Sequence, residues 1–282
     1  MDYRIDGNNL IIEDLSEFNI AHILDCGQVF RYRKEGDCYT LFAKNCKCLL
    51  RKDDNRVIIN TEQRDFFEEY FDLKTDYAAI KKALSESFPE LLNKAVSFGN
   101  GIRILKQDPF EMIISFIISA NNNIPRIKKI IEKICCGLGE EKDGYYAFPT
   151  VSQLAKADVN FFRECGAGYR AEYLVEAAKT LADFDYEAVR KADTVLARKK
   201  LLAIKGVGPK VADCILLFGF GRTDVFPVDT WSRKIYAALS LEEEKSARKM
   251  AVRLEKMFGK LAGYAQQYLF YYFRENKINT VI

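Results

Sequence analysis

The spacing of apolar residues changes near Thr61, and this change limits the fold more than any other feature of the sequence. From Asn9 to Thr61, short segments rich in β-branched and aromatic residues are separated by turn clusters, which is the pattern of an antiparallel meander. After Thr61, apolar residues recur every three or four positions, which is the period of amphipathic helices. The expected strands are QVFRYR, CYTLFA, CKCLLR and RVIINT, with KEGD and KDDN as turns.

Helical spacing continues to the carboxyl terminus. Several expected helices have proline at or near their first turn, where its missing N–H costs no intrahelical hydrogen bond; these prolines are Pro109, Pro125 and Pro209. The sequence therefore predicts an α+β fold, with an antiparallel β-sheet domain and linking helices in residues 1–100 and an all-helical domain in residues 101–282. The expected helices cover residues 62–73, 76–87, 89–99, 108–120, 124–135, 151–157, 169–184, 195–204, 209–220, 229–240, 242–258 and 262–276.

Composition and length point to an ordinary globular protein. With 282 residues, 49% of them hydrophobic, the chain can bury a sizeable core. No apolar run reaches the roughly 18–20 residues that cross a bilayer, and the first residues, MDYRIDGNNL, lack the basic and apolar parts of a secretion signal. We therefore expect no membrane partner and a cytoplasmic location, or a nuclear one in a eukaryote.

The eight cysteines do not form a metal-binding pattern. The sequence has no CxxC pair, His22 is its single histidine, and no cysteine follows Cys214. A chain of this size without a secretion signal also gives little reason to expect a disulfide framework. We expect reduced thiols, no metal centre and no cofactor.

The net charge of +3 is unevenly distributed, because acidic residues are in excess over residues 1–100 and basic residues over residues 101–282. A basic surplus favours nucleic acid as a partner, since Lys and Arg neutralise phosphates. Scattered charge that keeps a protein soluble would give the same count. Charge alone therefore leaves both interpretations open.

A glycine turn lies inside LLAIKGVGPKVADCILLFGF, residues 201–220. Two short helical segments flank Gly206, Val207 and Gly208, and this arrangement predicts a helix-hairpin-helix. Glycine permits positive φ and close approach of another molecule, and the N–H groups at a helix start attract anions such as nucleic-acid phosphates. An ordinary tight turn between packed helices is the alternative. A nucleotide P-loop is disfavoured, because valine follows Lys210 and no GxxxxG precedes it.

Asp229 stands in FPVDTWSRK, directly before another expected helix. Its simplest role is that of a helix N-cap. A carboxylate that caps a helix and also faces a cleft can stabilise positive charge in a substrate or assist proton transfer. Asp229 considered alone leaves both roles open.

Taken together, these residues resemble the helix-hairpin-helix DNA glycosylase superfamily, and within it the 8-oxoguanine DNA glycosylase/AP lyases. The resemblance rests first on GVGPKVADCILLFGF followed by VFPVDTW. Further similar motifs occur in order over nearly the whole chain, and their joint occurrence is more specific than any one of them. They are CGQVFRYR at 26–33, SFIISANNNIPRI at 115–127, CGAGYRAEY at 165–173 and GYAQQYLF at 263–270.

The resemblance implies a bifunctional enzyme that flips a damaged nucleotide out of double-stranded DNA and cleaves its N-glycosidic bond. Lys210 would attack C1′, and Asp229 would assist it and stabilise the developing oxocarbenium charge. A Schiff base would then form and permit β-elimination of the strand. A lysine attacks only as a neutral amine, and the positive end of its helix disfavours the ammonium form.

The resemblance also implies a base pocket, in which the flipped purine would stack between Cys214 and Phe270 while Gln266 reaches its Watson–Crick edge. The backbone carbonyl of Gly27 would accept the N7–H that 8-oxoguanine has and guanine lacks. As simpler roles, Cys214 would be a small core residue and the three asparagines at 121–123 a helix stop.

The resemblance assigns Asn121 to the hole that the flipped base leaves in the duplex, where it would also contact the estranged cytosine. It assigns Arg126 and Arg170 to the edge of that cytosine, and Tyr169 to a wedge in the base stack. Gly206, Val207 and Gly208 would hold a phosphate. We therefore expect a monomer that acts on 8-oxoguanine opposite cytosine.

Two residues depart from the family pattern. Trp231 stands where eukaryotic members usually have histidine, which puts a phosphate contact in doubt, and Lys205 replaces a common proline. Two other functions remain as alternatives: a non-catalytic helix-hairpin-helix DNA-binding module, and a glycosylase for another damaged base. The missing cysteine cluster disfavours an endonuclease III-like member.

Overall fold

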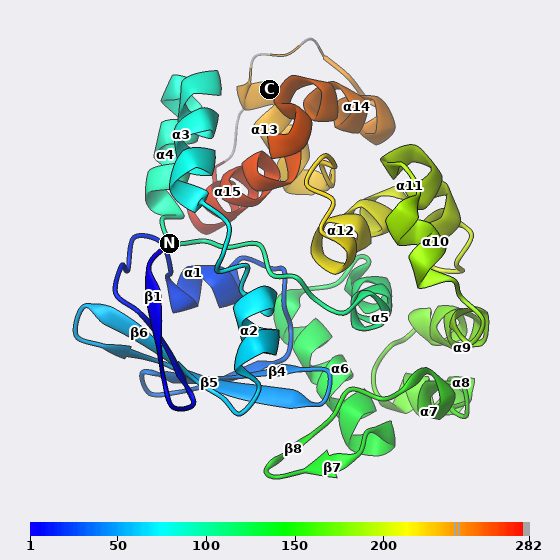
Figure 1. The fold of residues 1–282 in the computed structure, drawn as a ribbon. Helices are drawn as coiled ribbons and strands as arrows, with labels where there is room; N and C mark the ends of the chain where they lie inside the picture. The colour runs from blue at the N-terminus through cyan, green and yellow to red at the C-terminus, as the bar shows by residue number, and fades with distance from the viewer. Residues whose placement is uncertain (240, 242, 279–282) are drawn as a thin grey trace.

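The computed structural model describes residues 1–239, 241 and 243–278 (Figure 1). It has a six-stranded antiparallel sheet at the amino-terminal end, followed by helices, so the α+β prediction is confirmed. Positions 240 and 242, where one expected helix ends and the next begins, lie outside the described residues. No described helix is both long enough and apolar enough to cross a membrane.

The sheet has the strand order β1-β2-β6-β5-β4-β3. In β5, buried Cys48 and Leu50 alternate with exposed neighbours, and they pair with buried residues of the adjacent strands: Leu41 with Cys48, and Leu50 with Ile59. This two-residue period gives one apolar face, and α1 and α2 pack on it (Figure 1). The bounds are β1 Tyr3–Asp6, β2 Asn9–Ile12, β3 Tyr32–Glu35, β4 Cys38–Ala43, β5 Cys46–Asp53, β6 Arg56–Asn60, α1 Ile20–Asp25 and α2 Arg64–Tyr70.

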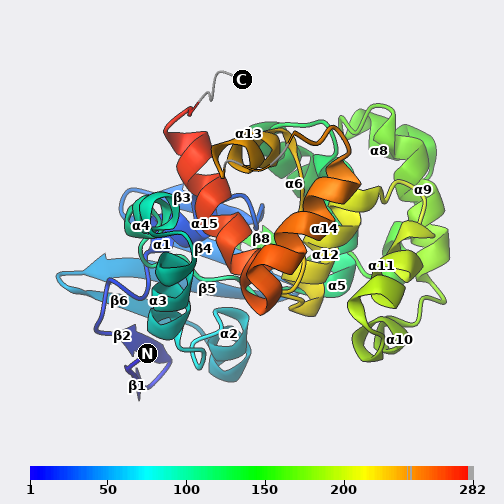
Figure 2. The ribbon, with the colours of Figure 1, turned by 90° about the horizontal axis from the view of Figure 1, so that it is seen from above.

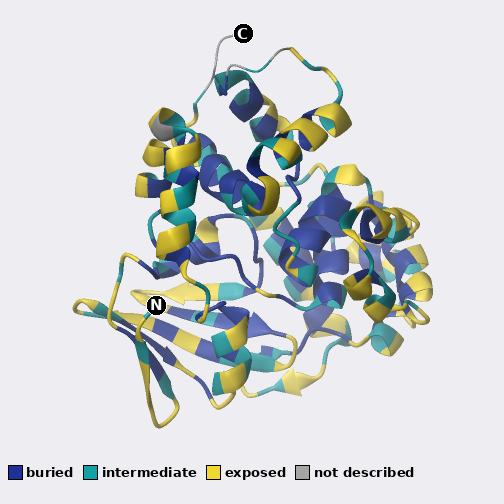
Figure 3. Ribbon diagram, turned by 45° about the horizontal axis from the view of Figure 1, so that its top comes forward, coloured by how far each residue is buried: buried dark blue, intermediate teal, exposed yellow. Residues whose placement is uncertain are grey.

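The helices that follow form two further cores. One lies around α12, which is buried along most of its length, and the other lies where α15 packs against α4, α13 and α14 (Figures 2 and 3). The bounds are α3 Tyr77–Ser87, α4 Pro89–Phe98, α5 Pro109–Ser119, α6 Ile124–Leu138, α7 Val151–Leu154, α8 Val159–Glu164, α9 Arg170–Leu181, α10 Tyr186–Lys191, α11 Thr194–Leu202, α12 Pro209–Phe220, α13 Thr230–Ala238, α14 Ala247–Phe258 and α15 Ala262–Glu275.

The first expected strand, QVFRYR, was wrong at its start, because β3 begins only at Tyr32. Gln28 is fully buried, and its side chain bonds to backbone groups far along the chain, so this segment serves the junction between sheet and helices. The sequence prediction missed β1 and named no strand at the position of β2, although it placed β2 within the sheet region. It also missed the short helices α1, α8 and α10 and a hairpin of β7 Glu141–Lys142 and β8 Tyr145–Tyr146.

An extended segment, residues 102–107, connects the sheet side of the molecule to α5. Gln28 donates to the carbonyl of Arg103 (2.8 Å) and accepts from the N–H of Leu105 (2.8 Å). At its far end, Gln107 donates through its backbone N–H to Phe218 in α12 (2.9 Å). The junction segment is thus hydrogen-bonded to both parts of the protein.

Arg103 is the most buried charge of this junction. Its guanidinium donates to the carbonyls of Phe71 (2.9 Å), Thr75 (3.1 Å) and Glu17 (3.2 Å), and it also bonds to the carbonyl of Asp72. The ring of Tyr77 lies 4.0 Å from the guanidinium carbon. Burial lowers the pKa of Arg103, and these carbonyl and ring contacts compensate for its lost hydration.

We predict that Arg103→Met destabilises the fold by about 3 kcal/mol or more, because the substitution leaves several buried carbonyls without donors. Urea unfolding followed by circular dichroism measures the change. Arg51→Met, at an exposed position of β5, is the matched control and should shift stability by about 0.5 kcal/mol or less. Equal stability of the two variants would contradict the role given to Arg103.

Candidate active site

The glycine turn joins α11 to α12 and packs tightly against α9. Gly206 has φ +88°, and a Cβ there would lie 2.8 Å from Cβ of Tyr173 and 3.3 Å from Ile117. Val207 is buried, and its N–H donates to the carbonyl of Ile204 (3.0 Å). Position 206 therefore requires glycine for both its backbone angle and its space.

Gly208 is the N-cap of α12 in an extended conformation. In the part of the chain that the structure describes, no hydrogen bond occupies the N–H of Gly206 or of Gly208. These two amides, with the positive end of the α12 dipole behind them, form an anion-binding arrangement. The N–H of Val207 is already used inside the turn, so this residue contributes its buried side chain.

Lys210 is the second residue of α12 and is half-buried. Its Nζ lies 5.3 Å from the ring centroid of Phe116, a buried residue of α5. One turn further on, the Cys214 thiol is also buried. Burial raises the pKa of Cys214 to about 11, and the charge and hydrogen bond of Lys210 oppose that shift. The thiol is therefore protonated near neutral pH and packs as a small apolar group beside the amine.

Asp229 is the N-cap of α13, as its simplest interpretation predicts. Its Oδ1 accepts from the N–H (2.8 Å) and from Oγ (3.0 Å) of Ser232. Asp229 also raises the pKa of Cys214 by its charge, which places the carboxylate in the electrostatic neighbourhood of the thiol and Lys210. The cap leaves Oδ2 without a hydrogen-bond partner among the described residues, so capping and a role toward a substrate are compatible.

The loop around Gly27 lies against α15. Gly27 has φ +86°, and a Cβ there would lie 3.3 Å from Cε1 of Phe270 and 3.0 Å from Nη1 of Arg274. Gln267 donates to the carbonyl of Cys26 (2.8 Å). The structure thus brings Gly27 and Phe270 together, although they lie at opposite ends of the chain.

Gln266 is one turn before Phe270 on the same helix. It is buried, and its Oε1 has no hydrogen-bond partner among the described residues. A buried acceptor without a partner costs free energy, so its presence calls for an explanation such as a ligand.

The expected opposite-strand residues gather around the loop after α5. Asn121 is exposed with φ +50°, and Asn123 caps α6 by accepting from the N–H of Arg126 (3.0 Å). Arg126 and Tyr169 are exposed. Arg170, in contrast, is 3% exposed and donates to the carbonyls of Ala120 (2.8 Å), Asn121 (2.8 Å) and Ala167 (3.2 Å). In this structure its guanidinium holds the loop in place and is not free to meet a base.

Lys205 and Trp231, the two residues that depart from the expected motif pattern, each take part in a contact between a lysine and an aromatic ring. Lys205 is exposed, with Nζ 5.8 Å from the ring centroid of Tyr173. Trp231 is half-buried, and Nζ of Lys234 lies 4.2 Å from its ring centroid. Both lysines add positive charge on the side of the hairpin and of α13.

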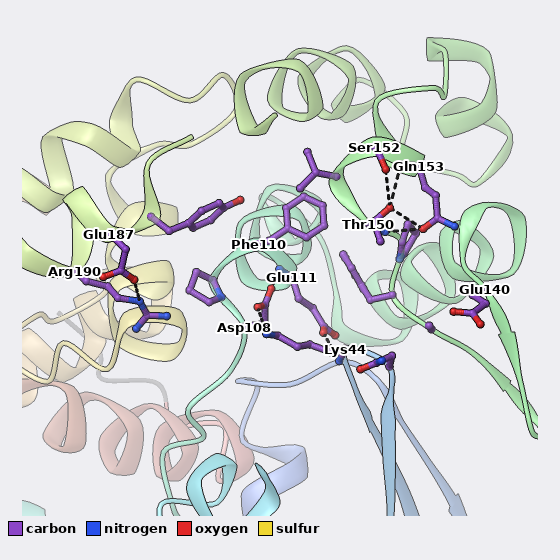
Figure 4. Close-up of a pocket in the computed structure, with 17 residues that line it drawn as sticks. Lys44, Asp108, Phe110, Glu111, Glu140, Thr150, Ser152, Gln153, Glu187 and Arg190 are labelled. Atoms are coloured by element: carbon purple, nitrogen blue, oxygen red, sulfur yellow. Dashed lines mark hydrogen bonds and ion pairs between the residues drawn. The ribbon is translucent and has the colours of Figure 1, made fainter. Parts of the chain in front are cut away.

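A separate cavity of about 800 Å³ lies between the sheet and the helices. Its walls include Phe110, Glu111, Thr150 and the ion pair of Lys44 with Asp108 (3.0 Å) (Figure 4). None of the site residues expected from the sequence lines it. Among the described residues, no group of three or more His, Cys, Asp or Glu side chains is arranged to hold a metal ion.

Sequence reasoning missed one buried ionic group behind the hairpin. Arg198 of α11 donates to Asp213 of α12 (2.5 Å) and bonds to Glu255 of α14. Asp213 interrupts an otherwise apolar helix face, which is the signal that would have identified it. Sequence reasoning also missed Phe116 and Arg274, whose partners are distant in the sequence.

Two family models match the chain. The 8-oxoguanine DNA glycosylase N-terminal domain matches residues 10–113, and the HhH-GPD superfamily of base excision DNA repair proteins matches residues 114–260. The chain belongs to the HhH-GPD superfamily. Within it the chain is an 8-oxoguanine glycosylase/lyase relative, and it is a DNA N-glycosylase with AP lyase activity.

Several known proteins are similar to this chain over most of its length. It is 30% identical to the N-glycosylase/DNA lyase of Saccharomyces cerevisiae, over 90% of this chain and 83% of that protein. It is 34% identical to a probable N-glycosylase/DNA lyase of Methanothermobacter thermautotrophicus, over 76% of this chain and 75% of that protein. The structure of the Clostridium acetobutylicum 8-oxoguanine glycosylase/lyase, solved with double-stranded DNA containing cytosine opposite to 8-oxoguanine, has a TM-score of 0.92 and 41% identity, over 99% of this chain and 100% of that chain.

We predict that Arg198→Met destabilises this glycosylase by about 3 kcal/mol at neutral pH, because the buried carboxylate of Asp213 and the partly buried one of Glu255 lose their cation. Burial raises the pKa of Asp213 and of Glu255, and Arg198 opposes both shifts. A raised folded-state pKa gives stability at low pH that is lost as pH rises through that pKa. Without Arg198 both pKa values rise further, so the defect should shrink as the pH is lowered from about 7.5 to about 5.

Thermal and urea unfolding at several pH values measure this effect. Arg163→Met is the control, because its ion pair with Glu172 is exposed on both sides and should contribute little to stability at any pH. A defect of Arg198→Met that stays constant with pH would contradict the buried-charge explanation.

Proposed function

We propose that the protein excises 8-oxoguanine opposite cytosine from double-stranded DNA and then cuts the strand by β-elimination. The observation that supports this most directly is the neighbourhood shared by Lys210, Asp229 and Cys214 behind an anion-binding hairpin. The substrate is supported by the similar Clostridium acetobutylicum enzyme, which was solved with DNA of that composition. All the proposed contacts come from one chain, so we propose that it acts as a monomer.

In the proposed reaction, Nζ of Lys210 attacks C1′ as the bond from C1′ to the base breaks and the base leaves with the electron pair. Asp229 stabilises the positive charge that develops on the sugar and assists proton transfer. Opening of the sugar ring gives a Schiff base between C1′ and Lys210. Loss of a proton from C2′ then expels the phosphate at C3′, which cuts the strand.

The pocket for the base is proposed between Cys214 and Phe270. Gln266 meets the Watson–Crick edge of the base, which would satisfy its unpaired Oε1. The carbonyl of Gly27 accepts N7–H, the donor that distinguishes 8-oxoguanine from guanine. Both proposed domains therefore contribute to the proposed base pocket: residues 1–100 supply Gly27, and residues 101–282 supply the other pocket residues.

We propose that Asn121 fills the space that the flipped nucleotide leaves in the duplex, while Arg126 meets the cytosine of the opposite strand and Tyr169 wedges the base stack. Arg170 can read the cytosine only after it releases the carbonyls that it now binds, so its first task is to hold the loop of Asn121. The N–H groups of Gly206 and Gly208, on either side of Val207, hold a phosphate.

We predict that borohydride traps a covalent adduct between the native protein and an 8-oxoguanine:cytosine duplex, because borohydride reduces the Schiff base to a stable amine. Lys210→Gln should give no adduct. Denaturing gel electrophoresis detects the product, and a duplex with guanine in place of the lesion is the control. A native protein that cannot be trapped, but binds the duplex, would favour the DNA-binding module.

We predict that Asp229→Asn slows excision by about 10²-fold, since the carboxylate charge at the sugar is lost. Asparagine is as good an N-cap as aspartate, so stability and binding of damaged DNA should be kept. Single-turnover excision and a binding titration on the same duplex measure the two effects. Unchanged excision would return Asp229 to the role of a helix cap.

A further inference from the structure

Arg274 lies one turn after Phe270 and two turns after Gln266 on α15, so all three side chains share one helix face. It is 16% exposed at its side chain and lies beside the loop of Gly27. No role for it follows from the sequence motifs. Its contacts, however, reach two parts of the proposed base pocket: the loop of Gly27 and the ring of Phe270.

The guanidinium of Arg274 makes three kinds of contact. Nη2 bonds to the carbonyl of Asp25, two residues before Gly27. The guanidinium carbon lies 5.2 Å from the ring centroid of Phe270, within the range of a cation–π contact. Nε pairs with Glu275 at 2.8 Å.

The remaining nitrogen of the Arg274 guanidinium, Nη1, differs from Nη2 and Nε. Nη1 is buried and has no hydrogen-bond partner among the described residues, and it lies 3.0 Å from the position that a Cβ on Gly27 would take. A buried charged donor without a partner is costly. A side chain at position 27 would crowd Nη1, so glycine at this position allows the guanidinium to lie against the loop.

The loop is also held at two other points. Gln267 binds the carbonyl of Cys26, and the buried side chain of Gln28 binds the junction segment. Asp25, Cys26 and Gln28 are thus fixed, and Gly27, which has positive φ, is the residue between them whose carbonyl direction these anchors set. Arg274 also contacts the ring of Phe270, on which the base would stack.

We propose that Arg274 is a positioning residue for base recognition: it fixes the direction of the Gly27 carbonyl through Asp25 and fixes the ring plane of Phe270. This rests on the proposed function. Arg274 acts through these two groups and does not itself touch the sugar. Its loss should therefore impair the step that needs the base, and spare strand cleavage at a site that has none.

The test compares two single-turnover rates for native protein and for Arg274→Met: excision from an 8-oxoguanine:cytosine duplex, and cleavage of a duplex with an abasic site opposite cytosine. We expect excision to fall by about 10-fold or more and abasic-site cleavage to change by about 3-fold or less. Arg274→Lys keeps a cation near Phe270 and a donor for Asp25, so it should recover most of the excision rate.

The matched control is Arg190→Met, which removes a guanidinium of α10 that lies 5.5 Å from the ring centroid of Phe220. It should leave both rates unchanged, and urea unfolding checks that each variant is folded. Equal loss of both rates in Arg274→Met, or no loss in either, would overturn the inference alone. A native protein that cleaves abasic sites but does not excise 8-oxoguanine would overturn the proposed substrate and this inference with it.

Discussion

The hydrogen bonds of the junction segment are the constraint on which the rest of the structure depends. Residues 102–107 run between the sheet and the helices and are bound by Gln28 from one side and by α12 from the other. Buried backbone groups without partners are costly, so this segment has few alternative positions. The loop of Gly27 continues directly from Gln28, and α12 carries Lys210. The junction thus relates the two halves of the proposed site to each other.

The proposed site also shows how one residue can serve both fold and chemistry. Asp229 caps α13 with one oxygen and keeps the other free of partners among the described residues. Arg170 holds the loop that ends in Asn121 while its donors match those of a base reader. Such shared use explains why the simpler structural roles inferred from the sequence were correct for Asp229 without excluding a role toward DNA.

Local signals in the sequence were sufficient to predict the hairpin turn, the cap at Asp229 and the long helices. The turn at Gly206 and the cap at Asp229 each lie within a few residues of the helix that they begin, and period and caps identified the long helices. The six-residue helices α1, α8 and α10 have too few turns for a period to be visible. Arg274 could not be identified, because its partner Asp25 lies 249 positions away in the sequence. Gln28 was placed in a strand for the same reason.

The rigidity of the hairpin turn has a consequence for the thermodynamics of the proposed phosphate binding. Val207 is locked in the core, Gly206 is enclosed by Tyr173 and Ile117, and the two amides beside Val207 are therefore held in fixed directions before any phosphate arrives. The conformational entropy of this turn is lost during folding and not during binding. In the proposed function, the hairpin would thus be a rigid phosphate receptor of uniform strength along any sequence, and discrimination between bases would be left to the proposed pocket.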